Sequence, residues 1–254
     1  MDTGRFTGKA EIYKKFRSSY PAELIGYLYS QIGFAKNSVI ADIGSGTGIF
    51  SRLLLAKGSL VYCVEPNDDM RRTAETDLRD NAGFYNFISI NAPAENTGLP
   101  ENSIDFVTVA QAFHWFDRQI FKAECRRIVK KYGKVVLVWN IRDYKNEMIK
   151  KDYVIREKYC VDRKGLGESG GPPKDLADFF VNKSCEERVF QNDLILDCET
   201  YVGMNLSRSY SPREDNNPEK YHGMVKELSA LFDEYSADGV IRFPQLTKSY
   251  IGEV

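Results

Sequence analysis

The chain has 254 residues, of which 43% are hydrophobic and 28% are charged, and its 35 basic residues nearly balance 36 acidic ones. This composition is typical of a globular α/β domain and lacks the basic surplus with which nucleic-acid-binding proteins neutralise phosphates. No apolar run approaches the roughly 18 residues of a membrane span, and the first residues have no signal-peptide core.

The first half of the chain alternates predicted helices and strands. Apolar residues at helical intervals predict a helix over 9–32, interrupted at Pro21. Short apolar runs predict strands over 39–42, 59–65, 87–91, 103–110 and 134–140. The segments between them predict helices over 49–57, 68–81 and 118–131. Strands separated by helices imply crossover connections and therefore a parallel sheet.

The alternation of strands and helices stops after residue 140. The pattern there predicts a charged helix, a Gly/Pro-rich loop, a short helix, a strand, an amphipathic helix and two strand-like runs, over 147–160, 165–173, 174–182, 185–190, 218–235, 240–243 and 247–251. We therefore expect one domain over 1–254. Its core comprises 35–140 with strands 185–190 and 240–252, and its cap comprises 1–32 and 141–238.

The strongest functional signal is Asp42-Ile43-Gly44-Ser45-Gly46-Thr47-Gly48, which lies between a predicted strand and a predicted helix. Glycines in such a loop permit a tight turn and let a ligand approach the backbone. Glu65 ends the next predicted strand, where a carboxylate can accept hydrogen bonds from both hydroxyls of a ribose. The alternative is a plain strand-to-helix turn in which Asp42 caps the helix.

The glycine spacing separates two kinds of cofactor. Dinucleotide enzymes favour Gly-x-Gly-x-x-Gly, whose helix faces a pyrophosphate, whereas this loop has Gly-x-Gly-x-Gly after a carboxylate. A carboxylate repels a pyrophosphate but attracts the ammonium of an amino-acid tail. S-adenosylmethionine has that ammonium and a ribose but no phosphate. We therefore predict that it is the cofactor and that it contacts Asp42, Gly44, Ser45, Gly46, Gly48 and Glu65.

Aromatic residues follow the fourth predicted strand, at the edge where ligands bind in such sheets. Trp115 is predicted to contact the cofactor, because aromatic faces attract a cationic sulfonium within about 6 Å, and core packing is the alternative. His114 is the candidate general base, with a structural hydrogen-bond donor as the alternative. Tyr13 and Arg17 share one face of the first predicted helix, either as a lid over the cofactor or as a solvated surface.

Four segments resemble class I S-adenosylmethionine-dependent methyltransferases. They correspond to the first motif, the second motif, the segment bordering adenine and the fourth-strand motif, over 39–51, 61–70, 92–100 and 109–117. The last is similar to a small-molecule branch, methyltransferase type 11, that includes trans-aconitate methyltransferases. Residues 6–21 and 243–252 resemble the cap and the closing strand of that branch.

This resemblance implies a Rossmann-like, seven-stranded, mostly parallel sheet with one antiparallel strand, helices on both faces and a helical cap. It also implies cofactor contacts from Pro66, Met70, Ala94, Glu95 and Gln111. Pro93 departs from the family, which often has a polar residue there, so the backbone of Ala92 or Ala94 would meet the adenine.

We expect a cytoplasmic enzyme with a small-molecule acceptor and no nucleic-acid or membrane partner. Five widely spaced cysteines without Cys-x-x-Cys indicate reduced thiols and no metal site. A more specific hypothesis is O-methylation of a small carboxylic acid, which needs no base and which Arg17 or Arg208 would clamp. The alternatives are an RNA or protein methyltransferase, a nicotinamide dehydrogenase, and a non-catalytic S-adenosylmethionine-binding protein.

Overall fold

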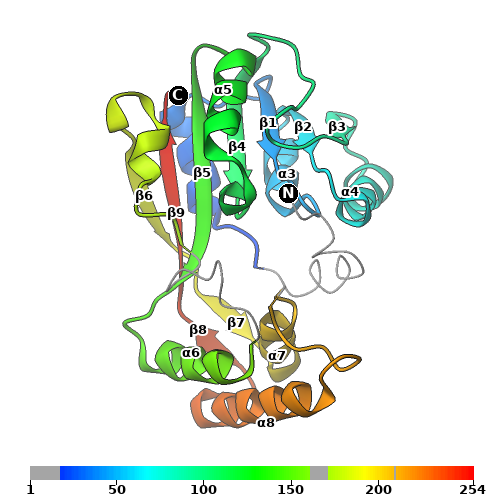
Figure 1. Ribbon diagram of the computed structural model, residues 1–254, viewed down its shortest axis with the longest axis vertical. Helices are drawn as coiled ribbons and strands as arrows, with labels where there is room; N and C mark the ends of the chain where they lie inside the picture. The colour runs from blue at the N-terminus through cyan, green and yellow to red at the C-terminus, as the bar shows by residue number, and fades with distance from the viewer. Residues whose placement is uncertain (1–17, 161–170, 209) are drawn as a thin grey trace.

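The computed structural model describes residues 18–160, 171–208 and 210–254. Seven strands form one sheet in the order β3-β2-β1-β4-β5-β9-β6 (Figure 1). They are β1 (Val39–Ile43), β2 (Leu60–Val64), β3 (Phe87–Ile90), β4 (Ile104–Ala110), β5 (Val129–Arg142), β6 (Glu186–Gln191) and β9 (Gln245–Gly252). Strand β9 pairs antiparallel with both β5 and β6, and the other pairs are parallel. The expected mostly parallel sheet with one antiparallel strand is confirmed.

Both faces of this sheet are buried, because its central strands are apolar on alternate sides. One face packs against α2 (Ala22–Tyr27), its π-helical continuation η2 (Leu28–Ile32), α3 (Ile49–Ala56), α4 (Asp68–Glu75) and η3 (Thr76–Asn81). The other face packs against η4 (Phe113–Trp115), α5 (Arg118–Ile128) and η5 (Leu176–Phe179). In β5, for example, Val138 faces the first group of helices and Trp139 faces the second.

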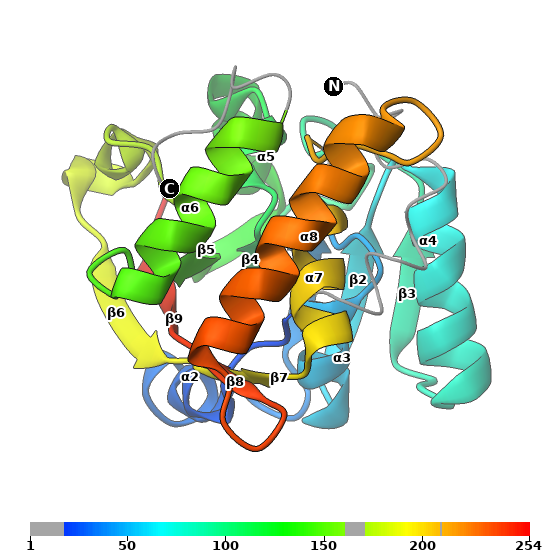
Figure 2. The same cartoon turned by 90° about the horizontal axis from the view of Figure 1, so that it is seen from below.

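A cap lies beyond the carboxyl ends of the parallel strands (Figure 1). It consists of α6 (Glu147–Tyr159), α7 (Cys198–Leu206), α8 (Pro218–Tyr235) and a two-stranded antiparallel sheet of β7 (Leu194–Leu196) and β8 (Ile241–Phe243). Helices α6 and α8 lie side by side (Figure 2). The cap has an apolar cluster of its own that includes Met148, Tyr201, Leu228 and Phe243.

Several boundaries differ from the sequence-based expectation. The helix predicted over 118–131 ends at Ile128, because the buried Val129 pairs with Ile104 and starts β5. The strand predicted over 240–243 belongs to the cap rather than the core, because it pairs with β7. The pattern predicted neither β7 nor α7.

The cap is also smaller at its N-terminal side than predicted. Of the range 1–32, residues 22–32 pack on the sheet, where Leu24 and Leu28 are fully buried. The short helix predicted over 174–182 is two separate 3-10 turns, η5 and η6 (Val181–Lys183), because Phe180 between them is extended. No helix among the described residues is long and apolar enough to cross a membrane.

Candidate functional site

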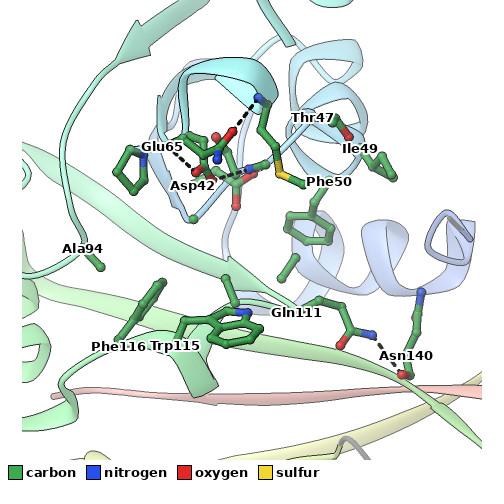
Figure 3. A pocket seen from close by; sticks show the side chains of 18 of the residues that line it. Asp42, Thr47, Ile49, Phe50, Glu65, Ala94, Gln111, Trp115, Phe116 and Asn140 are labelled. Atoms are coloured by element: carbon green, nitrogen blue, oxygen red, sulfur yellow. Dashed lines mark hydrogen bonds between the residues drawn. The ribbon is translucent and has the colours of Figure 1, made fainter. Parts of the chain in front are cut away.

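A pocket opens where the parallel strands of the main sheet end (Figure 3). Its empty space, including its open mouth, is about 1040 Å³. Ten of the residues predicted to bind a cofactor line it: Asp42, Gly44, Ser45, Gly46, Glu65, Pro66, Met70, Ala94, Gln111 and Trp115. The remaining lining residues are Ser18, Tyr20, Thr47, Ile49, Phe50, Asn67, Ala110, Ala112, Phe116 and Asn140.

The loop between β1 and α3 forms one wall of the pocket. The amides of Gly44 and Ser45 donate to the carbonyl of Val64 at 2.8 and 3.2 Å, which ties the loop to the end of β2. Gly46 has φ +57°, and a side chain there would meet nothing nearer than Met70 Sδ at 3.6 Å. The space beside Gly46 is therefore pocket, and a ligand can approach its backbone.

Gly48 has a different role from the one predicted. It does not line the pocket, since its missing side chain would lie 2.6 Å from Leu78 Cδ1. Its φ of +80° is the left-handed geometry that starts α3. Gly48 therefore serves the turn and the packing against η3.

Glu65 follows β2, with 8% of its surface exposed. Its Oε2 accepts the amide of Gly46 at 3.0 Å and its Oε1 accepts the amide of Asn67 at 2.8 Å. Burial raises the pKa of Glu65, and the two amides oppose that rise. Because each carboxylate oxygen has two acceptor sites, one remains on each oxygen for a ligand's hydroxyl groups.

Asp42 lies beneath the loop, 1% exposed. Its Oδ2 accepts the hydroxyl of Ser51 and its Oδ1 accepts that of Thr108 at 2.8 Å. Burial raises the pKa of Asp42 to about 6, although both hydroxyls oppose the rise. The side chain lines the pocket floor and also joins β1, α3 and β4.

Two buried hydroxyl groups in the same wall have no partner among the described residues. They are Ser45 Oγ and Thr47 Oγ1, and both residues line the pocket. Buried polar atoms are nearly always hydrogen-bonded, so exceptions call for an explanation. Their position beside Gly46 and Glu65 indicates that a polar ligand completes this wall.

The opposite wall is formed by Gln111, Trp115 and Asn140 (Figure 3). Gln111 has φ +59°, which is uncommon outside glycine, and its Nε2 donates to the carbonyl of Asn140 at 2.9 Å. Asn140 Nδ2 in turn donates to Ser18 Oγ at 3.2 Å and to the carbonyl of Ser19 at 3.1 Å. These bonds hold the segment 18–20 beside the pocket.

Two other predicted residues, Glu95 and His114, lie outside the pocket wall. Glu95 Oε1 accepts the amide of Asp117 at 2.8 Å and so connects the segment after β3 to the start of α5. His114 is exposed and outside the lining, with its ring centroid 4.9 Å from that of Trp115. Tyr13 and Arg17 lie outside the described residues.

Sequence reasoning missed Asn140 as a site residue. Its signal was a polar side chain at the end of an apolar predicted strand, the same signal that identified Glu65. Thr47 and Phe50 could be found only from the folded structure, because helix and turn geometry decides which of residues 47–50 face the pocket. The described residues contain no cluster of three or more side chains suited to hold a metal ion.

Comparisons with known proteins agree with this geometry. Residues 41–137 match the family model described as a methyltransferase domain. An uncharacterized methyltransferase of Mycobacterium tuberculosis is 34% identical, with 92% of this chain and 89% of the relative covered. An uncharacterized methyltransferase of Schizosaccharomyces pombe is 26% identical over 95% of this chain and 93% of its own. A solved structure from Anaeromyxobacter dehalogenans, described as a type II methyltransferase, superposes with a TM-score of 0.66 at 21% identity, covering 94% and 98% of the two chains.

Proposed function

The chain belongs to the class I S-adenosylmethionine-dependent methyltransferases, and from that premise we propose which residues bind the cofactor and what the enzyme methylates. The cofactor of this family is S-adenosylmethionine. We assign it to the pocket between the Gly44–Thr47 loop and Trp115, and we assign a small molecule as the methyl acceptor.

The Glu65 carboxylate is the observation that carries this proposal. It is held rigidly by two backbone amides, faces the pocket and keeps one acceptor site on each oxygen. A ribose presents two neighbouring hydroxyl groups, which match these two sites. The open space at Gly46 and the unpartnered hydroxyls of Ser45 and Thr47 support the same placement.

Other pocket residues fit the rest of the cofactor. Pro66, Met70 and Ala94 give apolar surface beyond Glu65, suited to the adenine ring. Trp115 lies on the opposite wall, where an aromatic face can stabilise a positively charged sulfur. Gln111 is held in a strained conformation at the pocket, a feature that clusters at functional sites.

The protein's contribution to the reaction is alignment and exclusion of water. When bound, the cofactor supplies a methyl group on a cationic sulfur, which a nucleophile can attack directly. The Asn140 contacts to Ser18 and Ser19 fix residues 18–20 beside the pocket, where Ser18 and Tyr20 form part of its lining. Tyr13 and Arg17 remain sequence-based candidates for a lid.

The acceptor in this proposal is a small carboxylic acid methylated on oxygen. A carboxylate is ionised at neutral pH and needs no general base. This agrees with the pocket lining, which contains no histidine, since His114 lies outside it. Among the described lining residues the carboxylates are Asp42 and Glu65, and both are engaged by neighbouring groups.

Calorimetric titration with S-adenosylhomocysteine tests the cofactor site. Glu65→Ala removes a charged acceptor, and we expect a loss of about 1.5–3 kcal/mol, or about 10-fold to 150-fold in Kd. Glu75→Gln is the matched control, because Glu75 lies outside the pocket and accepts the hydroxyl of Ser89. Equal affinity for the wild type and Glu65→Ala would reject the assignment of Glu65.

A further inference from the structure

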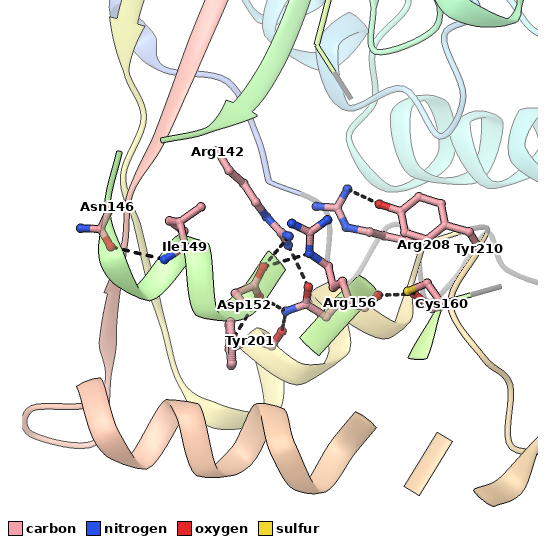
Figure 4. A network of polar contacts seen from close by, with 11 residues as sticks. Arg142, Asn146, Ile149, Asp152, Arg156, Cys160, Tyr201, Arg208 and Tyr210 are labelled. Carbon is pink, nitrogen blue, oxygen red and sulfur yellow. Dashed lines mark hydrogen bonds and ion pairs between the residues drawn. The ribbon is translucent and has the colours of Figure 1, made fainter. Parts of the chain in front are cut away.

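A buried network of polar side chains joins the cap to the end of β5 (Figure 4). Arg142 comes from the last residue of β5, and Asp152 and Arg156 come from α6. Tyr201 and Asn205 come from α7 and are fully buried. Arg208 and Tyr210 follow in the segment after α7, where Arg208 Nη1 donates to the hydroxyl of Tyr210 at 3.3 Å.

Asp152 is shared by two guanidinium groups. Its Oδ2 accepts Arg142 Nη1 at 2.6 Å and Arg156 Nε at 2.9 Å. Its Oδ1 accepts the hydroxyl of Tyr201 at 3.0 Å and Asn205 Nδ2 at 3.1 Å. The four acceptor sites of this carboxylate are therefore used, and it balances only one of the two positive charges that it contacts.

Each of these two arginines keeps a buried donor with no acceptor among the described residues. The donors are Arg142 Nε and Arg156 Nη2, on residues that are 6% and 8% exposed. A buried charged group that lacks a hydrogen-bond partner is costly. Two such donors in one place indicate an acceptor that the described part of the chain does not supply.

Arg208 adds a third positive charge to the same place. Figure 4 shows its guanidinium gathered with those of Arg142 and Arg156. The pKa of Arg142 is lowered to about 9, mainly by burial; Asp152 opposes this shift, and Arg156 and Arg208 add to it. Burial raises the pKa of Tyr210, but the three arginines outweigh it, so the net shift is downward. The positive charge of neighbouring arginines therefore contributes to both shifts, although burial is the larger cause for Arg142.

This polar network lies next to the proposed cofactor pocket. Asn140 lines the pocket. Arg142 is two residues further along β5 on the same face, and the rise of a strand places the two Cα atoms about 7 Å apart. Gln245 is the β9 partner of Arg142, and its Nε2 donates to Ser18 Oγ, which also lines the pocket. The three arginines themselves are not among the lining residues. A ligand group on the arginines would therefore be separate from an atom that faces the pocket.

We propose that Arg142, Arg156 and Arg208 bind a carboxylate of the methyl acceptor that is separate from the atom that receives the methyl group. A carboxylate has two acceptor oxygens, which match the two unpartnered donors of Arg142 and Arg156. The inference rests on the proposed function, since it concerns the acceptor of that reaction. It implies that the acceptor has at least two functional groups, one held by the cap and one presented to the pocket.

Arg208→Gln is the main test variant, because it removes a charge without breaking the contacts of Asp152. Arg156→Lys is the second variant, since it keeps the charge but removes the planar fork. Arg213→Gln is the matched control, because Arg213 is an exposed arginine of the same cap segment whose partner is Asp215 at 2.7 Å. The thermal midpoint of each variant is measured to confirm folding.

The titrations use di- and tricarboxylic acids such as glutarate and citrate, with glutaramide as the neutral analogue. They are run with and without saturating S-adenosylhomocysteine. We expect at least one acid, but not the amide, to bind the wild type, and Arg208→Gln to weaken it about 10-fold or more. Arg156→Lys should also weaken acid binding, and Arg213→Gln should leave it within about 2-fold.

A further readout separates ligand binding from a purely structural role. A bound carboxylate adds negative charge beside Tyr210, so it should raise the pKa of that hydroxyl in a spectrophotometric titration. Failure of every acid to bind the wild type, or equal affinity for the wild type and Arg208→Gln, overturns the proposal. If the wild type binds an acid but does not bind S-adenosylhomocysteine, the proposed function is rejected and the carboxylate site is not.

Discussion

Replacing Asp42 with Asn removes a carboxyl group from a place unfavourable to charge. Asp42 is 1% exposed, and its oxygens accept the hydroxyls of Ser51 and Thr108. Burial raises its pKa to about 6 from the ordinary value of 3.8, and the hydroxyls only partly offset this. The folded state therefore binds the Asp42 proton more tightly than the unfolded chain does.

The sign and size of the effect follow from this difference in proton binding. The contribution of Asp42 to the wild-type free energy of unfolding should decrease as the pH rises from about 3.8 to about 6, and it should change no further above that. Each pH unit between 3.8 and about 6 changes the free energy of unfolding by about 1.36 kcal/mol, so the whole change due to Asp42 is about 3 kcal/mol. Asn does not ionise. The stability of Asp42→Asn minus that of the wild type should therefore increase by up to about 3 kcal/mol across this range.

Urea unfolding of both ligand-free proteins between about pH 4 and pH 8 measures this difference. Subtracting the two curves cancels the titration of every group that the substitution leaves unchanged. Ser51→Ala is an internal control, because the Ser51 hydroxyl lowers the pKa of Asp42 and its removal should extend the decline above about pH 6. A difference that is constant with pH, or that decreases as the pH rises, would refute this reasoning.

Three further predictions concern the glycine loop and the cap. Gly46→Val should remain folded but lose S-adenosylhomocysteine binding, because its side chain would occupy the pocket; normal calorimetric affinity would contradict this. Gly48→Ala should lower the free energy of unfolding by about 1–3 kcal/mol through its contact with Leu78, while the folded protein still binds S-adenosylhomocysteine. Tyr210 should ionise below its ordinary pKa of 10 in the spectrophotometric difference between the wild type and Tyr210→Phe, and Arg208→Gln should raise that pKa. An unchanged Tyr210 titration in Arg208→Gln would contradict the charge account.

The parts of the fold that follow local patterns could be predicted from the sequence. Strand β1, the glycine loop and α3 are consecutive, so one stretch of sequence holds the apolar run, the turn residues and the helix. The position of Glu65 after β2 could be predicted from the rule that adjacent parallel strands end at the same edge of a sheet. Six predicted cofactor residues line the pocket for this reason: Asp42, Gly44, Ser45, Gly46, Glu65 and Trp115. Four others that line it were predicted from the family resemblance: Pro66, Met70, Ala94 and Gln111.

The cap could not be predicted in the same way, because its contacts join distant segments. Strand β8 is three residues long, and it pairs with β7, 45 residues earlier by the register Ile241 to Leu196. The range 147–160 has the composition of a solvated, charged helix, yet Asp152 and Arg156 on it are buried. Only the approach of α7 and β5 makes them part of a network. Of its three arginines, the sequence indicated Arg208 alone.

The most direct test of the central claim supplies the enzyme and S-adenosylmethionine with three separate fractions of a cell extract: small molecules, RNA and protein. Mass spectrometry then measures S-adenosylhomocysteine and any compound that gains a methyl group. The account predicts that S-adenosylhomocysteine and a methylated acidic small molecule appear together in the first fraction, and that both decrease with Glu65→Ala. Formation of S-adenosylhomocysteine only with RNA or protein, or with none of the fractions, would contradict it.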